Sequence, residues 1–167
     1  MASFTKNPCE NKRMADSTHS STIVGWREWV AIPDLGVDWM KAKIDTGART
    51  SSVHAFDLVD HGDHVTFRLN PWQESEDDAR DASLPVHDRR VIRSSSGHEE
   101  ERIVVLLDVR LAGQAVTIET TLTNRDSMGF RMLIGREALR QGFLVDPALS
   151  FLGGRAPKAV RMANRGR

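Results

Sequence analysis

The stretch KIDTGARTSSVHA (residues 43–55) leaves an apolar segment on a single acid, Asp45, and then enters a turn. A carboxylate at the end of a buried strand is costly unless it is paired or used in chemistry. If Asp45 is catalytic, Ile44 anchors the strand, Thr46 braces the turn, and Gly47 lets backbone N–H groups and a substrate come close. Taken alone, the stretch also fits a turn in which Asp45 makes only a local hydrogen bond.

Length and composition limit the classes of function. The 167 residues suit one domain with tails, and the 23 basic residues balance the 23 acidic ones, so no overall field attracts nucleic acid or an acidic membrane. Cys9 is the only cysteine, which leaves no intrachain disulfide and disfavours a thiolate metal site. Because no apolar signal segment or membrane-length run is present, we expect a cytoplasmic protein.

The chain divides into three predicted parts. Residues 1–22 are polar without a period and predict a disordered leader. Residues 155–167, RAPKAVRMANRGR, predict a basic tail, either solvated or docking an acidic partner. The domain between them, residues 23–154, is expected to carry the function.

The domain reads as all-β with one short helix. Five runs have strand composition or alternation: VGWREWVAI, VDWMKAKI, HVTFRL, RIVVLLDVRL and AVTIETTLT. The turns PDLG and AGQ join two pairs of these runs into predicted hairpins. GREALRQG (residues 135–142) predicts the helix, closed by Gly142. A small barrel or sandwich fits this pattern.

A long segment, residues 70–102, interrupts the strands. It begins with an acidic run and becomes basic at Arg89, Arg90 and Arg93. Long insertions in compact domains tend to be functional or mobile. RSSSG (residues 93–97) predicts the tip of a hairpin, and a plain surface loop is the alternative.

A second motif, RMLIGRE (residues 131–137), places apolar residues and then Gly135 and Arg136 before the predicted helix. With IDTGA upstream, the sequence resembles the retropepsin-like aspartic peptidases. The resemblance implies a closed barrel of the acid-protease type, with Asp45, Thr46 and Gly47 as catalytic residues. It also implies that Ile134 and Gly135 are structural residues at the site, where the glycine lets two backbones touch.

A closer resemblance covers about residues 25–152, through segments such as KAKIDTGARTSSVHAF and TLTNRDSMGFRMLIGREAL. They are similar to the bacterial family labelled ATP-dependent zinc proteases, which is associated with the ATP-grasp ligase that adds glutamates to a ribosomal protein. That ligase is therefore an expected partner.

The sequence contains no motif for binding the zinc or the ATP that this family label names. The chain has neither a His-Glu-x-x-His motif nor a phosphate-binding Gly-x-x-x-x-Gly-Lys-Ser/Thr loop. His54, His61 and His64 are interpreted as surface histidines of a polar hairpin. We therefore expect no metal and no cofactor.

The mechanism implied by the resemblance requires a second chain. Aspartic peptidases use two carboxylates that share one proton, and this chain has a single Asp-Thr-Gly. The other carboxylate must come from a homodimer with the site on its two-fold axis. A flap is expected near RSSSGHEE, with Arg93, Ser95 and Gly97 contacting substrate.

One departure from the retropepsin pattern indicates the substrate. The position that usually holds an acid after Asp-Thr-Gly-Ala holds Arg49, so Arg136 needs another partner. Ala48, Arg49, Arg93 and Arg136 are therefore assigned to binding an acidic, glutamate-tailed protein. The alternatives are a non-catalytic dimeric β module that binds a ligase or ribosomal protein, and a zinc-dependent peptidase. No nucleic-acid or membrane partner is expected.

Overall fold

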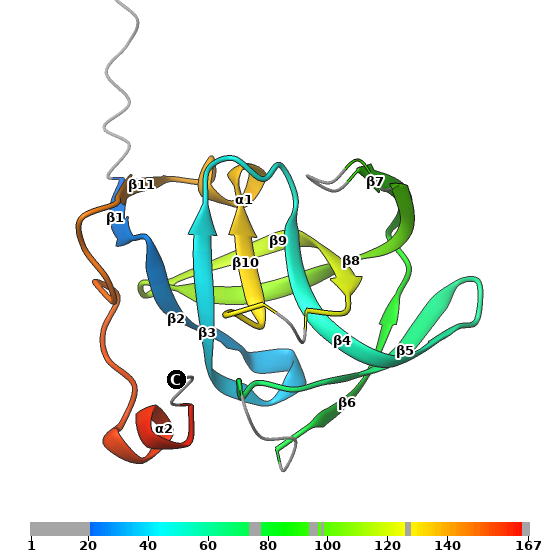
Figure 1. Cartoon of the computed structure of the whole chain (residues 1–167), viewed down its shortest axis with the longest axis horizontal. Helices are drawn as coiled ribbons and strands as arrows, with labels where there is room; N and C mark the ends of the chain where they lie inside the picture. The colour runs from blue at the N-terminus through cyan, green and yellow to red at the C-terminus, as the bar shows by residue number, and fades with distance from the viewer. Residues whose placement is uncertain (1–20, 74–77, 94–96, 98, 126–127, 165–167) are drawn as a thin grey trace, which may run out of the picture.

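The computed structural model describes residues 21–73, 78–93, 97, 99–125 and 128–164. Figure 1 shows a molecule built mostly of β-strands. Its first elements are β1 (Thr22–Gly25), β2 (Arg27–Ile32), the 3-10 turn η1 (Pro33–Leu35), β3 (Val37–Asp45), β4 (Ser51–Asp60) and β5 (His64–Leu69). The remaining elements are β6 (Arg80–Pro85), β7 (Asp88–Arg93), β8 (Glu99–Leu111), β9 (Gln114–Thr123), β10 (Met132–Gly135), α1 (Arg136–Leu139), β11 (Phe143–Asp146) and α2 (Lys158–Ala163).

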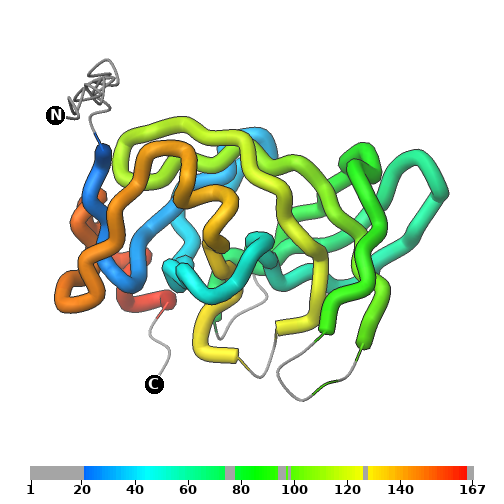
Figure 2. The backbone as a smooth tube through the Cα atoms, turned by 90° about the horizontal axis from the view of Figure 1, so that it is seen from above, coloured from blue at the N-terminus to red at the C-terminus, as the bar shows by residue number. Residues whose placement is uncertain are grey.

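The strand pairs of the main sheet form a ring. The order runs β10-β3-β2-β8-β9-β4, and β10 then pairs with β4 again. Strands β5 and β6 continue outward from β4, and β7 pairs with β8. Figure 2 shows the β4–β5 hairpin at the end of the molecule opposite to β1 and β11. The predicted all-β class is confirmed, and the closed barrel stays a prediction.

Strand β10 lies between β3 and β4, and this arrangement positions the candidate site. It pairs in parallel with β3, where Ile134 is opposite Ile44, and antiparallel with β4, where Met132 is opposite Val53. The β3–β4 loop therefore passes over the end of β10, as Figure 1 shows. Residues that follow Asp45 in the loop are brought beside Gly135 in space.

The core holds the strands together through buried aliphatic side chains. Met40, Ile118, Met132 and Ile134 are each at most 2% exposed. Burial of a side chain of this size contributes about 1.5–3 kcal/mol. The ends of β3 and β10 are thus fixed on their inner faces, which holds the adjoining loop in place.

Several local predictions are confirmed. Strands β2 and β3 form the hairpin expected across PDLG, with η1 in the turn, and β8 and β9 form the hairpin across AGQ. The helix expected at residues 135–142 is α1, followed by Gly142 at φ +113°. Strands β7 and β8 form a hairpin, because Arg93 pairs with Glu99, and residues 94–96 of its predicted tip RSSSG lie outside the described residues.

Other local predictions were wrong. A second helix, α2, lies in the segment expected to be a tail with little to bury, and Asn164 beyond it is 1% exposed. The run VGWREWVAI is two strands, because β1 leaves β2 at Trp26 to pair with β11. The segment expected to be irregular contains β6 and β7, whose polar composition hides their pairing. No helix in the described part of the chain is long and apolar enough to cross a bilayer.

The buried carboxylate of Glu28 ties β2 to the C-terminal segment. Its Oε1 accepts hydrogen bonds from the backbone N–H of Gly25 at 2.6 Å and of Leu152 at 2.9 Å, and its Oε2 from Gly153 at 3.1 Å. Glu28 is 0% exposed. Since a buried carboxylate requires such partners, the three donors explain why an acid occupies this core position.

Candidate active site

The carboxylate of Asp45 is oriented by its own loop. Its Oδ1 accepts hydrogen bonds from the backbone N–H of Gly47 at 3.0 Å and of Ala48 at 3.1 Å. The other oxygen, Oδ2, lies 3.7 Å from the ammonium group of Lys43. The Asp45 side chain is 27% exposed, so in this single chain the acid is not the buried group that the sequence analysis expected. Oδ1 is thus fixed by the loop, while Oδ2 faces a lysine ammonium group.

The glycine at the end of β10 allows a backbone-to-backbone contact. A Cβ atom added to Gly135 would lie 2.7 Å from the carbonyl carbon of Thr50 and 2.9 Å from the carbonyl oxygen of Arg49. The N–H of Gly135 donates to the hydroxyl oxygen of Ser51 at 3.0 Å, and the N–H of Arg136 donates to the carbonyl of Ala48 at 2.8 Å. These contacts fix the loop that carries Asp45.

Two of the three arginines expected to bind substrate have partners on this loop and on α1. Arg136 donates from Nη1 to the carbonyl oxygen of Thr46 at 3.2 Å, and it does not line the cavity described below. Arg49 lines that cavity, and its Nε lies 3.8 Å from the Glu137 carboxylate. Thr46 is exposed. The partner that Arg136 needs is therefore a carbonyl group rather than an acid.

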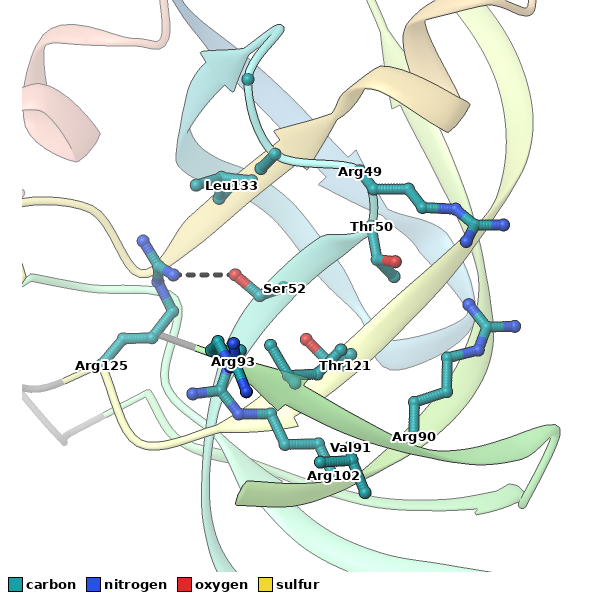
Figure 3. A pocket seen from close by; sticks show the side chains of 13 residues that line it. Arg49, Thr50, Ser52, Arg90, Val91, Arg93, Arg102, Thr121, Arg125 and Leu133 are labelled. Carbon is teal, nitrogen blue, oxygen red and sulfur yellow. Dashed lines mark hydrogen bonds between the residues drawn. The ribbon is translucent and has the colours of Figure 1, made fainter. Parts of the chain in front are cut away.

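A cavity of about 660 Å³ opens beside the Asp45 loop, and five arginines line it. They come from the loop, from the β7–β8 hairpin and from the segment after β9: Arg49, Arg90, Arg93, Arg102 and Arg125. Gly47 and Ala48 line it too, so the cavity adjoins the backbone that holds the carboxylate. Figure 3 shows Arg93, Arg102 and Arg125 gathered at one side and Arg49 and Arg90 at the other.

Four of these arginines have carboxylate partners. Arg93 contacts Glu99 at 2.7 Å, Arg102 contacts Glu100 at 2.9 Å, and Arg49 lies near Glu137. Arg90 contacts Asp88 and Glu119, each at 2.5 Å.

The double contact of Arg90 changes the titration of the groups involved. The hydrogen bonds that Arg90 donates to Glu119 and Asp88 raise the pKa of Arg90, and the bond to Glu119 lowers the pKa of Glu119. Arg90 also lowers the pKa of Asp88 through a hydrogen bond. Both carboxylates are therefore held in the charged form, and this arginine is fixed at the cavity wall.

Arg125 differs from the other four. It is 7% exposed, and its guanidinium group donates to Ser52 Oγ at 2.7 Å and to the carbonyl oxygen of Phe130 at 3.1 Å. Figure 3 shows the bond to Ser52. Desolvation by burial, followed by repulsion from Arg102, lowers the pKa of Arg125, while the charge of Asp45 opposes that shift. Among the residues that the structure describes, no carboxylate forms an ion pair with it.

Sequence reasoning missed Arg102 and Arg125. Arg102 stands in the charged run EEER at the start of β8, and Arg125 in the polar segment after β9. Neither position has a local signal, since long-range pairing places both: β8 with β7 and β9 for Arg102, and β9 with β4 for Arg125.

The segment in which a flap is expected contains the β7–β8 hairpin. Arg93 lies on it and lines the cavity. Gly97 is exposed near its tip at φ +84° and does not line the cavity. Ser95 lies outside the described residues.

The histidine interpretation needs one correction. His54 is 2% exposed rather than on the surface, its ring stacks on Phe56 at 5.7 Å, and its Nδ1 accepts the backbone N–H of Arg125 at 2.9 Å. His61 and His64 stack on each other at 4.4 Å in the β4–β5 hairpin. Within the described ranges, no three His, Cys, Asp or Glu side chains gather as a metal site would require.

Comparison with known proteins assigns a family to this arrangement. A family model described as RimB-like, retropepsin-like aspartic endopeptidase RimB, matches residues 23–156. The crystal structure of a Legionella pneumophila protein of unknown function is 28% identical, superimposes with a TM-score of 0.67, and covers 79% of this chain and 98% of its own.

Longer relatives carry a different name. A Shewanella pealeana protein named "Probable alpha-L-glutamate ligase" is 47% identical over 133 residues, which is 77% of this chain and 29% of that protein. A Desulfotalea psychrophila protein of the same name is 40% identical over 140 residues, 81% of this chain and 30% of that protein. This chain therefore spans less than a third of the length of these relatives.

Proposed function

The chain belongs to the RimB-like family of retropepsin-like aspartic endopeptidases, and from this premise we propose that it hydrolyses peptide bonds through Asp45. One observation carries the proposal. The Asp45 carboxylate has one oxygen fixed by the backbone N–H groups of Gly47 and Ala48, and these two loop residues line a large cavity. We assign residues 23–154 to the peptidase domain.

The geometry of Asp45 suits activation of a water molecule. Because Oδ1 is held by Gly47 and Ala48, Oδ2 is the oxygen proposed to meet a water or a second carboxylate, beside the Lys43 ammonium group 3.7 Å away. In the proposed reaction one carboxylate of a dyad removes a proton from water, and the other donates a hydrogen bond to the carbonyl of the bond to be cleaved. Two carboxylates about 3 Å apart share one proton, which supplies both roles.

The second carboxylate is proposed to be Asp45 of another copy of the chain. An apolar surface supports this dimer. Ile23 on β1 and Leu144 on β11 are opposite each other in the two-stranded sheet and are 55% and 57% exposed. The sheet and the Asp45 loop both lie along the upper edge of the molecule in Figure 1. A two-fold contact through this sheet covers the apolar pair and brings the two loops toward each other.

The dimer has a direct test. Leu144→Glu places a charge on the proposed contact without changing the core, since the side chain is exposed. Sedimentation should show a monomer, and peptide hydrolysis should be lost with it. Leu106→Glu, at an exposed leucine of β8, is the matched control and should stay dimeric and active. A monomeric Leu144→Glu protein with full activity would contradict the proposal.

The substrate is proposed to be an acidic, glutamate-tailed protein. The five arginines of the cavity supply planar donors that match carboxylates in geometry and charge. The names of the longer relatives support the same substrate, because a ligase that adds glutamate produces acidic tails. Arg49, Arg93, Arg102 and Arg125 are the proposed contacts, with Ala48 at the backbone; Arg136 is instead proposed to brace the loop through Thr46.

A second candidate is a non-catalytic module that binds a ligase. This candidate is favoured by the longer relatives, because the segment that matches this chain is part of proteins named as glutamate ligases. The discriminating experiment is mass spectrometry of a peptide with an oligo-glutamate tail, incubated with the protein, with Asp45→Asn, and with a chelator.

Each outcome of that experiment selects one function. Cleavage that survives chelation and disappears in Asp45→Asn supports the aspartic peptidase. Cleavage lost on chelation indicates a metallopeptidase. If a confirmed dimer cleaves nothing over a range of pH, the binding module is favoured.

A further inference from the structure

A second group of cations lies away from the Asp45 cavity, where the C-terminal segment packs on β2 and β3. A cavity of about 210 Å³ there is lined by four basic side chains and by two aromatic rings. We call it the C-terminal site; it comprises Arg27, Trp29, Lys41, Phe151, Arg155, Arg161 and Asn164. The matched family region ends at residue 156, so Arg161 and Asn164 lie beyond it.

The basic groups of this site are held in place by rings and neutral oxygens. The Arg27 guanidinium carbon lies 4.5 Å from the ring centroid of Trp26 and 5.0 Å from that of Phe151, and Nε donates to Ser150 Oγ at 3.2 Å. The Lys41 ammonium group lies 5.8 Å from the Trp29 ring and donates to the carbonyl of Asn164 at 3.2 Å. These contacts orient the cations and leave their charge uncompensated.

The charges of the site are unpaired in the described part of the chain. No carboxylate there forms an ion pair with Arg27, Lys41, Arg155 or Arg161. Burial, followed by repulsion from Arg27, lowers the pKa of Lys41. An anion in the cavity removes that repulsion, so the site is arranged to bind negative charge.

A buried amide and the size of the cavity limit the ligand. Asn164 is 1% exposed, and within the described ranges its Nδ2 makes no hydrogen bond. Small-molecule sites occupy about 300–1,000 Å³, so 210 Å³ is too small for a cofactor. The stacked rings of Trp29 and Phe151, 5.8 Å apart, give apolar contact to a side-chain stem. A carboxylate on a short methylene chain fits both features.

The site shares a strand face with Asp45. Lys41, Lys43 and Asp45 alternate along β3, so their side chains lie on one face, and Arg27 is opposite Lys43. Lys41 is about 13 Å from Asp45 at the rise of about 3.3 Å per residue of a strand. An extended peptide covers that distance in about four residues.

We propose that the C-terminal site binds carboxylate side chains of an acidic substrate segment whose other end lies at Asp45. The proposal rests on the proposed function for its substrate, and it adds a second anchor to it. A tail that reaches about four residues past the cleaved bond contacts both sites. Shorter tails contact only the cavity beside Asp45.

Binding to the Asp45→Asn protein tests the proposal without interference from cleavage. Fluorescence anisotropy gives the dissociation constants of two labelled peptides, one of about ten glutamates and one of about three. Arg155→Ala/Arg161→Ala removes two exposed cations that make no side-chain hydrogen bond among the described residues, so the fold is unaffected. This pair of substitutions should raise the dissociation constant of the long peptide about tenfold and leave that of the short peptide unchanged.

Controls separate a site from general charge. Arg110 is an exposed arginine of β8, and Arg110→Ala should change the affinity for neither peptide. Lys41→Gln should lower the affinity for the long peptide, as the double variant does. Equal loss for both peptides, or no loss in either variant, would overturn the proposal. An oligonucleotide of equal charge that competes as well as the long peptide would also overturn it, because the site would then bind polyanions of any kind.

The two proposals fail in different ways. If the wild-type protein cleaves no short peptide while the length-dependent binding stands, the peptidase function fails and the C-terminal site remains. If cleavage occurs and the length effect is absent, the C-terminal site fails alone.

Discussion

The arginines beside Asp45 and the cations of the C-terminal site have opposite surroundings. In the first cavity four of five arginines contact carboxylates of their own chain. In the second, aromatic rings and neutral oxygens hold Arg27 and Lys41, and the described residues pair no acid with them. A paired arginine must exchange partners to bind an acidic ligand, whereas an unpaired one need not. The first region, the cavity beside Asp45, is thus suited to positioning a substrate. The second region, the C-terminal site, is suited to holding it.

The largest effect is expected at Gly135, where the first region depends on a backbone contact. Gly135→Ala places a methyl group 2.7 Å from the carbonyl carbon of Thr50. This carbon belongs to the backbone, so it cannot rotate away as the end of a side chain could. We expect a loss of at least about 3 kcal/mol in the free energy of unfolding, measured by urea denaturation. Gly129→Ala is the control, since nothing lies within 4 Å of its added Cβ, and should change stability by less than about 0.5 kcal/mol. Equal stability of the two variants would show that the loop does not depend on this contact.

A smaller loss is expected at Glu28, which supports the second region. Glu28→Ala leaves the N–H groups of Gly25, Leu152 and Gly153 without their acceptor. An unsatisfied buried group costs about 1–3 kcal/mol, and partial hydration keeps the expected total near 2–3 kcal/mol. Thermal unfolding measures the loss, with the exposed Glu101→Ala as the control. A Glu28→Ala protein as stable as that control would mean that the C-terminal segment is held by other contacts.

Arg125 sharpens the comparison, because it is the arginine of the first region that resembles the second. Arg125→Gln keeps a donor for Ser52 and removes the charge. We expect KM for a glutamate-tailed peptide to rise about tenfold, with little change for a neutral peptide of the same length. An equal rise for both peptides would show that Arg125 is only structural, and Arg110→Gln is the charge-matched control.

The smallest effect concerns pH and the pairing of Arg90. Since the Arg90 hydrogen bond lowers the pKa of Glu119 in the folded state, the pair stabilises the fold above the ordinary value of 4.5, and that contribution disappears as the pH falls through the lower folded pKa. Because both side chains are partly exposed, the contribution is below about 1 kcal/mol. Denaturation of wild type and Arg90→Gln should differ at neutral pH and converge well below pH 4.5. A difference that persists in acid would point to packing rather than charge.

The sequence predicted those parts of the molecule that depend on local pattern. Alternation and turn residues predicted β3, β5, β8 and β9, and the resemblance to the retropepsin-like peptidases implied the close backbone approach at Gly135. Long-range pairing accounts for what was missed. The polar strands β6 and β7 have no apolar period, and α2 is held by Asn164 contacts to Lys41 and Gln73, far away in sequence.

The same limit applies to the candidate site. The hydrogen bonds that orient the Asp45 carboxylate join residues two and three positions apart, so they follow from local sequence. The contacts of the loop with Gly135 and Arg136 depend instead on long-range pairing. Arg102 reaches the cavity through the pairing of β8 with β7 and β9, and Arg125 through the pairing of β9 with β4 and its hydrogen bond to Ser52. The burial of His54 also depends on pairing, since β4 lies between β9 and β5.

The most direct test of the central claim is a subunit-mixing experiment. Wild-type protein is equilibrated with increasing amounts of Asp45→Asn at constant wild-type concentration, and hydrolysis of a glutamate-tailed peptide is followed. If each site uses Asp45 from two chains, activity falls to about half at equal amounts, because half of the wild-type chains then pair with the variant. Activity that stays constant as the variant is added, with exchange of subunits confirmed, would contradict a dyad shared between two chains.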